Sequence, residues 1–152
     1  MKSTTTALLL SLVCVSPVAA DMADKGDHTH PKKISKEQIA GKFFRDHKPL
    51  VQMHKSERGQ YKTEDLENFL SVDKKFDTGM YKSGPVRMSI DHYGVDEFMY
   101  FIEGGVTLTS NDGTVTKVEA GDAVTIGRDW KGVWDSDGYM KIYVIYSADE
   151  PL

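Results

Sequence analysis

Cysteine is almost absent from this sequence. Its 152 residues contain a single cysteine, Cys14, which lies in the apolar segment near the start of the chain. A chain that loses this segment has no cysteine at all. Disulfide bonds, cysteine nucleophiles and thiolate metal sites are then excluded.

Long hydrophobic runs are also absent after the first twenty residues. Lys2 supplies a positive charge, Ala7–Val15 is nearly all apolar, and Val18-Ala19-Ala20 offers small residues for cleavage. This order is typical of a signal peptide, and the apolar run is shorter than the roughly 20 residues that span a bilayer. Lipidation of Cys14 is an alternative, but Ser11-Leu12-Val13 lacks the small residue expected just before a lipoprotein cysteine. We expect residues 1–20 to be a signal peptide and the mature protein to be periplasmic or secreted, without membrane attachment.

Basic residues are not in excess in this sequence. Without Lys2 the chain carries 18 basic and 23 acidic side chains, a formal charge of −5, and the two signs are interspersed. Nucleic acid is therefore not an expected partner. No phosphate-binding loop, dinucleotide-binding fingerprint, serine-hydrolase elbow or His-Glu-x-x-His motif is present. The partner we expect is a small molecule.

The N-terminal part of the mature chain divides into a tail and a helical extension. Residues 21–34 are polar and predict a flexible tail, on which His28 and His30 form only a weak metal-binding pattern. Residues 35–71 predict short helices. Ser35 and Gln38 form a capping-box pattern ahead of a helix over Lys36–Arg45, and the spacing of apolar residues in Thr63–Leu70 predicts a further helical turn or two.

Residues 72–152 predict an all-β domain. Short β-branched and aromatic runs alternate with Gly, Asp and Asn clusters, as in a β-sandwich or barrel. Eight short strands suit a jelly roll. The expected strands are Phe76–Tyr81, Val86–His92, Glu97–Glu103, Val106–Ser110, Val115–Val118, Ala123–Ile126, Lys131–Asp135 and Lys141–Tyr146.

Five segments of this domain carry a family resemblance. Asp96–Gly104, with a glycine-aspartate turn at Gly121-Asp122, resembles the core signature of the cupin superfamily. The lead segment Lys82–Pro85 and the closing segments Gly132–Trp134 and Lys141–Ile145 resemble the (S)-ureidoglycine aminohydrolase and ethanolamine-utilisation type of cupin domain. The resemblance implies an RmlC-like cupin jelly-roll β-barrel, with short N-terminal helical segments ahead of it.

The resemblance also shows that most of the usual metal ligands are lost. Metal-binding cupins use three histidines and one glutamate, which suit a divalent ion. Glu97 and His92 stand at two of these places, whereas Ile90 replaces the first histidine and the third falls among Gly127, Asp129 and Gly132. We expect no cofactor, and the alternative is a weakly bound divalent metal held by His92 and Glu97, with Asp91, Asp96 or Asp129 in support.

The barrel interior is the expected binding site. Under the cupin alignment, Glu97 and His92 point inward and are the candidate catalytic residues, because a carboxylate among aromatic rings is a plausible acid or base. The candidate ligand-binding residues are Tyr81, Tyr100, Trp134, Lys141 and Tyr143, although aromatic residues on strands are often purely structural.

Two functions follow from this reading. The first is an exported protein that binds a small polar metabolite in the barrel. The alternative is a hydrolase-like or isomerase-like cupin enzyme, in which Glu97 and His92 act as acid and base on an amide, ureide or sugar-type substrate. In both cases we expect a homodimer, because pairing through the barrel sheets covers exposed strand edges.

Cleavage after Ala20 is directly testable. The mature protein recovered from the exported fraction should begin at Asp21, because the small residues of Val18-Ala19-Ala20 form the cleavage site. N-terminal sequencing or intact-mass measurement checks this. Cytoplasmic protein that retains Met1 would contradict the expected export.

Overall fold

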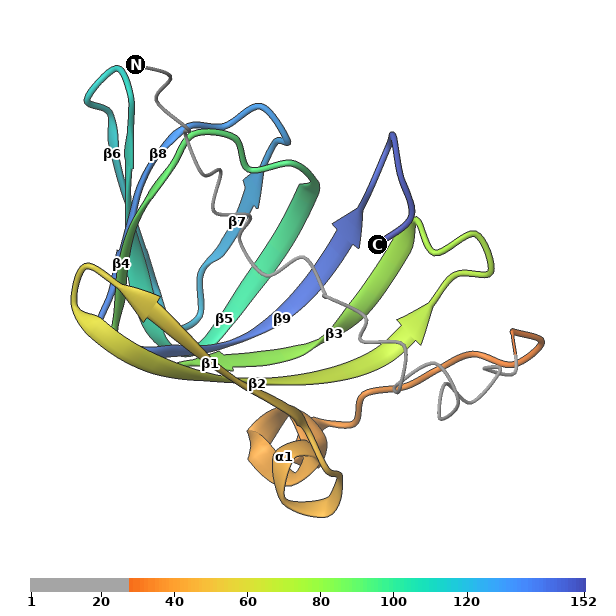
Figure 1. The fold of residues 1–152 in the computed structure, drawn as a ribbon. Helices are drawn as coiled ribbons and strands as arrows, with labels where there is room; N and C mark the ends of the chain where they lie inside the picture. The colour runs from red at the N-terminus through yellow and green to blue at the C-terminus, as the bar shows by residue number, and fades with distance from the viewer. Residues whose placement is uncertain (1–27) are drawn as a thin grey trace.

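The chain folds into a nearly closed β-barrel (Figure 1). The structure is a computed structural model and describes residues 28–152. The predicted signal peptide, residues 1–20, lies outside the described residues, as does the first half of the predicted tail, residues 21–27. Within the described range no helix is long and apolar enough to cross a membrane. The elements are η1 (Gln38–Lys42), α1 (Phe43–Asp46), β1 (Leu50–Ser56), β2 (Gly59–Leu70), β3 (Phe76–Ser83), β4 (Val86–Ile90), β5 (Asp96–Ser110), β6 (Val115–Glu119), β7 (Ala123–Ile126), β8 (Gly132–Ser136) and β9 (Tyr139–Tyr146).

Strand β5 is the centre of the sheet. The strand order is β1-β2-β3-β9-β5-β8-β4, and β6 and β7 also pair with β5. The first part of β5 pairs with β9 and β7, and its second part pairs with β8 and β6. The sequence predicted two strands here, but they form one strand that turns at Gly104, where φ is +67°. A Cβ at this position would lie 2.0 Å from the carbonyl oxygen of Gly138, so only glycine allows the turn.

The predicted helical extension over residues 35–71 is wrong beyond Asp46. The helix expected at Lys36–Arg45 is found as η1 and α1, and its capping box is present: the Ser35 amide donates to Gln38 Oε1 (2.7 Å) and the Gln38 amide donates to Ser35 Oγ (3.2 Å). Thr63–Leu70, however, belongs to strand β2. The register of β2 against β3 shifts between Glu67 and Phe69, and such a bulge adds one residue to the two-residue strand period. The bulge therefore gave the apolar residues of this strand a spacing like that of a helix.

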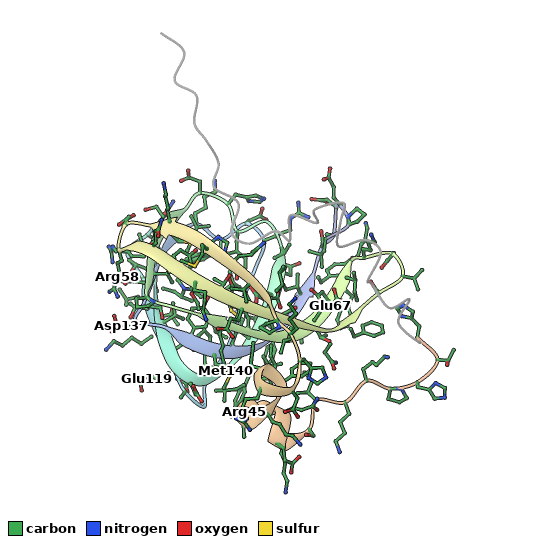
Figure 2. The ribbon with its side chains drawn as sticks, turned by 60° about the horizontal axis from the view of Figure 1, so that its bottom comes forward. Arg45, Arg58, Glu67, Glu119, Asp137 and Met140 are labelled. Carbon is green, nitrogen blue, oxygen red and sulfur yellow. The ribbon has the colours of Figure 1, made fainter. Side chains whose placement is uncertain are left out.

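The short helices cover the outer face of the sheet. Phe43 of α1 packs in a small core with Leu66 of β2, Met80 of β3 and Met140 of β9, all buried. Figure 2 shows Met140 behind the helical segment that carries Arg45. Leu66 and Met80 are register partners on this outer face. Because side chains alternate along a strand, the residues next to them on β2 and β3 face the barrel interior.

The β1–β2 hairpin closes the barrel. The Glu57 amide donates to the carbonyl oxygen of Arg87 on β4 (3.0 Å), and the two side chains pair at 3.2 Å. Arg58 pairs with Asp135 of β8 at 2.7 Å and also with Asp137, beside which it lies in Figure 2. These contacts bring the first two strands against the far end of the sheet.

Candidate functional site

A cavity of about 60 Å³ lies inside the barrel. A single water needs roughly 10–15 Å³ measured in this way, so the cavity holds about four to six water-sized groups. Its lining comes from β2, β3, β4, β5, β8 and β9, and from the loop before β5. The lining residues that carry polar groups are Tyr61, Asp65, Asp77, Tyr81, Ser83, Tyr93, Glu97, Trp134, Tyr139, Lys141 and Tyr143.

A buried ion pair forms the floor of the cavity. Lys141 Nζ on β9 donates to Glu97 Oε1 on β5 at 2.6 Å, and the two residues are 6% and 4% exposed. The ammonium group also lies 5.5 Å and 5.6 Å from the ring centroids of Tyr81 and Trp134. A buried charge is tolerated when it is paired and surrounded by such contacts. The pair therefore places a neutralised but strongly polar group inside the barrel.

Tyr93 holds the second carboxylate oxygen of Glu97. Its hydroxyl donates to Glu97 Oε2, and its ring lies parallel to that of Trp134. Burial raises the pKa of Tyr93 well above its ordinary value, and the charge of Glu97 raises it further. Tyr93 therefore remains a hydrogen-bond donor at physiological pH, and both oxygens of Glu97 accept from protein groups.

A second polar cluster lies on the β2–β3 side of the cavity. The Tyr143 hydroxyl lies 3.0 Å from Asp65 Oδ1 and 3.4 Å from Asp77 Oδ2. Burial raises the pKa of Asp65 to about 6. Burial also raises the pKa of Asp77 to about 8, with the charges of Glu67 and Asp65 adding to the effect. Asp77 is thus mostly protonated at neutral pH.

Gly79 gives Tyr143 its position. Gly79 and Tyr143 are register partners on β3 and β9. A Cβ at residue 79 would lie 2.5 Å from the Tyr143 hydroxyl oxygen, so the phenol ring reaches Asp65 on β2 by crossing the glycine. The cluster therefore depends on the absence of a side chain at residue 79 of β3.

Five of the seven predicted site residues line the cavity: Glu97, Tyr81, Trp134, Lys141 and Tyr143. His92 and Tyr100 do not. His92 is exposed in the loop after β4, and Tyr93, the next residue, turns inward to Glu97. Tyr100 is 40% exposed on the outer face of β5, because the two-residue alternation that buries Glu97 and Met99 turns it outward. The expected contact of Glu97 with His92 is not among those that Glu97 makes, since its two carboxylate oxygens are held by Lys141 and Tyr93.

The positions implied by the cupin metal site do not fit a metal ion. Ile90 is buried in the apolar core, and His92, Gly127 and Asp129 are exposed. The Lys141 ammonium already contacts Glu97, so a dication at this carboxylate would meet a positive charge at close range. In the part of the chain that the structure describes, no three His, Cys, Asp or Glu side chains are grouped to hold a metal.

Sequence reasoning missed Tyr93, Asp65 and Asp77. Tyr93 precedes Glu97 by four residues and directly follows His92, which was the predicted site residue. Asp77 and Tyr81 lie four residues apart on β3, so strand alternation places them on one face. Asp65 could not be found, because it fell within the segment taken for a helix.

Two buried polar atoms in the cavity wall lack a hydrogen-bond partner among the described residues. They are Nε1 of Trp134, which is 1% exposed, and Oδ1 of Asp77, which is 5% exposed. Leaving such an atom unpaired costs about 1–3 kcal/mol. Both residues line the cavity, so a molecule inside it can reach their polar atoms.

The raised pKa of Asp77 predicts a pH-dependent stability. Between about pH 4 and pH 8 the folded state binds more protons than the unfolded chain, so the free energy of unfolding falls as the pH rises through this window. Asp77→Asn removes this term. Its free energy of unfolding, measured by urea titration, should exceed that of the wild type at pH 8 by on the order of 5 kcal/mol and nearly equal it at pH 4. Asp91→Asn, at an exposed site, should change neither value. A parallel pH profile for Asp77→Asn and the wild type would contradict the assignment.

Comparisons with known proteins agree with this architecture. Residues 70–143 match the family model of the EutQ-like cupin domain. None of the curated proteins is a significant match. Among solved structures, a protein of unknown function of the DUF861 family from Pseudomonas syringae is 22% identical over 63% of this chain, with a TM-score of 0.57. This chain spans 44% of the length of that protein.

Two other structures match nearly along their whole lengths. An ethanolamine utilization protein (EutQ) from Salmonella typhimurium is 14% identical over 67% of this chain and 98% of its own, with a TM-score of 0.51. A protein of unknown function from Rhizobium leguminosarum is 15% identical over 78% of this chain and 98% of its own, also with a TM-score of 0.51. These likenesses confirm the predicted all-β cupin fold. The match over residues 70–143 and the barrel fold together support the predicted likeness to the cupin superfamily.

Proposed function

We propose that this protein is exported and that its barrel cavity binds a small polar metabolite. The observation that carries the proposal is Trp134 Nε1, a donor that is buried in the cavity wall without a partner among the described residues. A ligand oxygen in the cavity would accept from it. The neighbouring ion pair of Glu97 and Lys141 adds polar character to the same space.

The size of the cavity limits the ligand. Ligand pockets for drug-sized molecules measure about 300–1,000 Å³, several times the volume of about 60 Å³ here. A molecule of about four to six non-hydrogen atoms fits this space. Small amides and small fragments of ureides are of this size, whereas a whole sugar ring exceeds it.

The enzymatic alternative has weaker support. Acid–base catalysis by Glu97 and His92 requires both groups at one substrate, and His92 is exposed outside the cavity. Both carboxylate oxygens of Glu97 already accept hydrogen bonds, from Lys141 and from Tyr93. We do not extend the resemblance to the ureidoglycine reaction, since the metal-ligand places of that family are occupied by residues such as Ile90 and Gly127.

Ligand capture should depend on Trp134 and not on the other tryptophan. We expect native mass spectrometry of the exported protein, purified without a histidine tag, to show a bound small molecule. Trp134→Phe removes the unpaired donor and should weaken retention by about tenfold. Trp130→Phe is the matched control, because Trp130 donates to Ser110 Oγ (3.0 Å) and does not line the cavity. Equal loss in both variants, or a wild type that carries no ligand under any condition, would contradict the proposal.

A homodimer is the expected solution state. Strand β1 is the edge strand at one end of the strand order and pairs only with β2 among the described strands. Val51 and Met53 on this strand are 52% and 63% exposed, and an exposed apolar edge invites pairing with a second copy. Light scattering of the mature protein should give twice the monomer mass. A monomer at high protein concentration would contradict this expectation.

A further inference from the structure

The two sides of the cavity differ in charge. On the floor, Glu97 and Lys141 neutralise each other at 2.6 Å. On the β2–β3 side, Asp65 and Asp77 share the hydroxyl of Tyr143, and neither has an ion-pair partner among the described residues. Lys141 is the one cation in the described lining of the cavity, and Glu97 holds it. The β2–β3 side is therefore an acidic corner without its own counter-charge.

The unpaired atoms of the wall define what the cavity can accept. Asp77 Oδ1 is a buried acceptor in the acidic corner, and Trp134 Nε1 is a buried donor on a different wall. The two atoms call for opposite partners. A complementary molecule presents a hydrogen-bond donor to Asp77 and an acceptor to Trp134.

We infer that the cavity selects small molecules that carry a protonated amine at one end and a neutral carbonyl or hydroxyl oxygen at the other. The ammonium group pairs with Asp65 and Asp77, and the oxygen accepts from Trp134 Nε1. This assignment rests on the proposed ligand-binding function and names its ligand class. Anionic molecules are disfavoured, because the ammonium of Lys141 is already paired and the remaining charged groups of the lining are carboxyl groups.

Binding of such a cation is coupled to proton release. The groups around Asp77 are Asp65 and Glu67 on β2 and the Tyr143 hydroxyl on β9, while Lys141 and Glu97 act on Asp65 from the cavity floor. Asp77 carries a proton at pH 7, since its pKa is raised to about 8. An ammonium beside it favours the carboxylate, so the Asp77 proton passes to solvent as the ion pair forms.

Glycinamide and glycolamide are suitable probes. They have the same number of non-hydrogen atoms and the same amide oxygen, and differ in an ammonium against a hydroxyl group. By isothermal titration calorimetry at pH 7 we expect glycinamide to bind about tenfold more tightly or better. Its apparent enthalpy should change with the ionisation enthalpy of the buffer, in the sense of proton release, whereas that of glycolamide should not.

Variants of the acidic corner separate this inference from ligand binding as such. Asp77→Asn keeps the shape of the side chain and should remove both the preference for glycinamide and the proton release. Asp65→Asn provides the same test at the half-buried member of the cluster, should the first variant fold poorly. The matched control is Asp91→Asn, at an exposed position outside the cavity, which should bind both probes as the wild type does.

The possible outcomes separate the two proposals. Equal binding of the two probes, weakened alike by Trp134→Phe, would overturn the cationic assignment and leave ligand binding in place. Tighter glycinamide binding that survives in both Asp77→Asn and Asp65→Asn would also overturn it. Binding of neither probe to the wild type would contradict both the assignment and the proposed function for ligands of this size.

Discussion

The buried ion pair between Glu97 and Lys141 is the contact on which the interior of the barrel depends. In the register of β5 with β9, Lys141 stands opposite Phe101, so its side chain must run along β5 to reach Glu97, four residues earlier. It passes the sulfur of Met99 at 3.1 Å on the way. Moving two charges out of water costs several kcal/mol for each ion, and the loss of one partner would leave the other uncompensated. The pair therefore ties the register of the two central strands to the polar floor of the cavity.

The same pair places a fixed positive charge beside the carboxylate that the cupin resemblance implied as a metal ligand. A carboxylate inside a barrel needs a positive charge or strong donors nearby. Lys141 supplies a covalently attached cation, and the Tyr93 hydroxyl satisfies the second oxygen. Under this arrangement a buried Ile90 and an exposed His92 carry no penalty, because Glu97 no longer needs them. Lys141 thus supplies a positive charge at the carboxylate where the resemblance implied a metal ion.

The fold could be predicted from the sequence where the two-residue strand period was regular. Ala123–Ile126 was predicted with its observed bounds as β7, and the cupin resemblance placed Glu97, Lys141 and Tyr143 among the residues of the barrel interior, where they lie. The prediction failed at irregular points. The bulge after Glu67 gave β2 a false helical spacing, and the loop between Ile90 and Asp96 follows no period that tells whether His92 or Tyr93 turns inward. Asp65 was lost with the first error and Tyr93 with the second.

The acidic corner could not be foreseen for a different reason. Asp65 and Asp77 come from the consecutive strands β2 and β3, whereas Tyr143 comes from the distant strand β9, and the three meet only because Gly79 lets the phenol ring cross β3. Nothing in the local pattern indicates that two carboxyl groups will share one hydroxyl. Burial raises the pKa values of both carboxyl groups and lowers stability at neutral pH, a cost that a purely structural core would avoid by using apolar residues. Groups that cost stability and also line a cavity are best explained by what the cavity binds, and this is the physical reason to look for function at the β2–β3 wall as well as at Glu97.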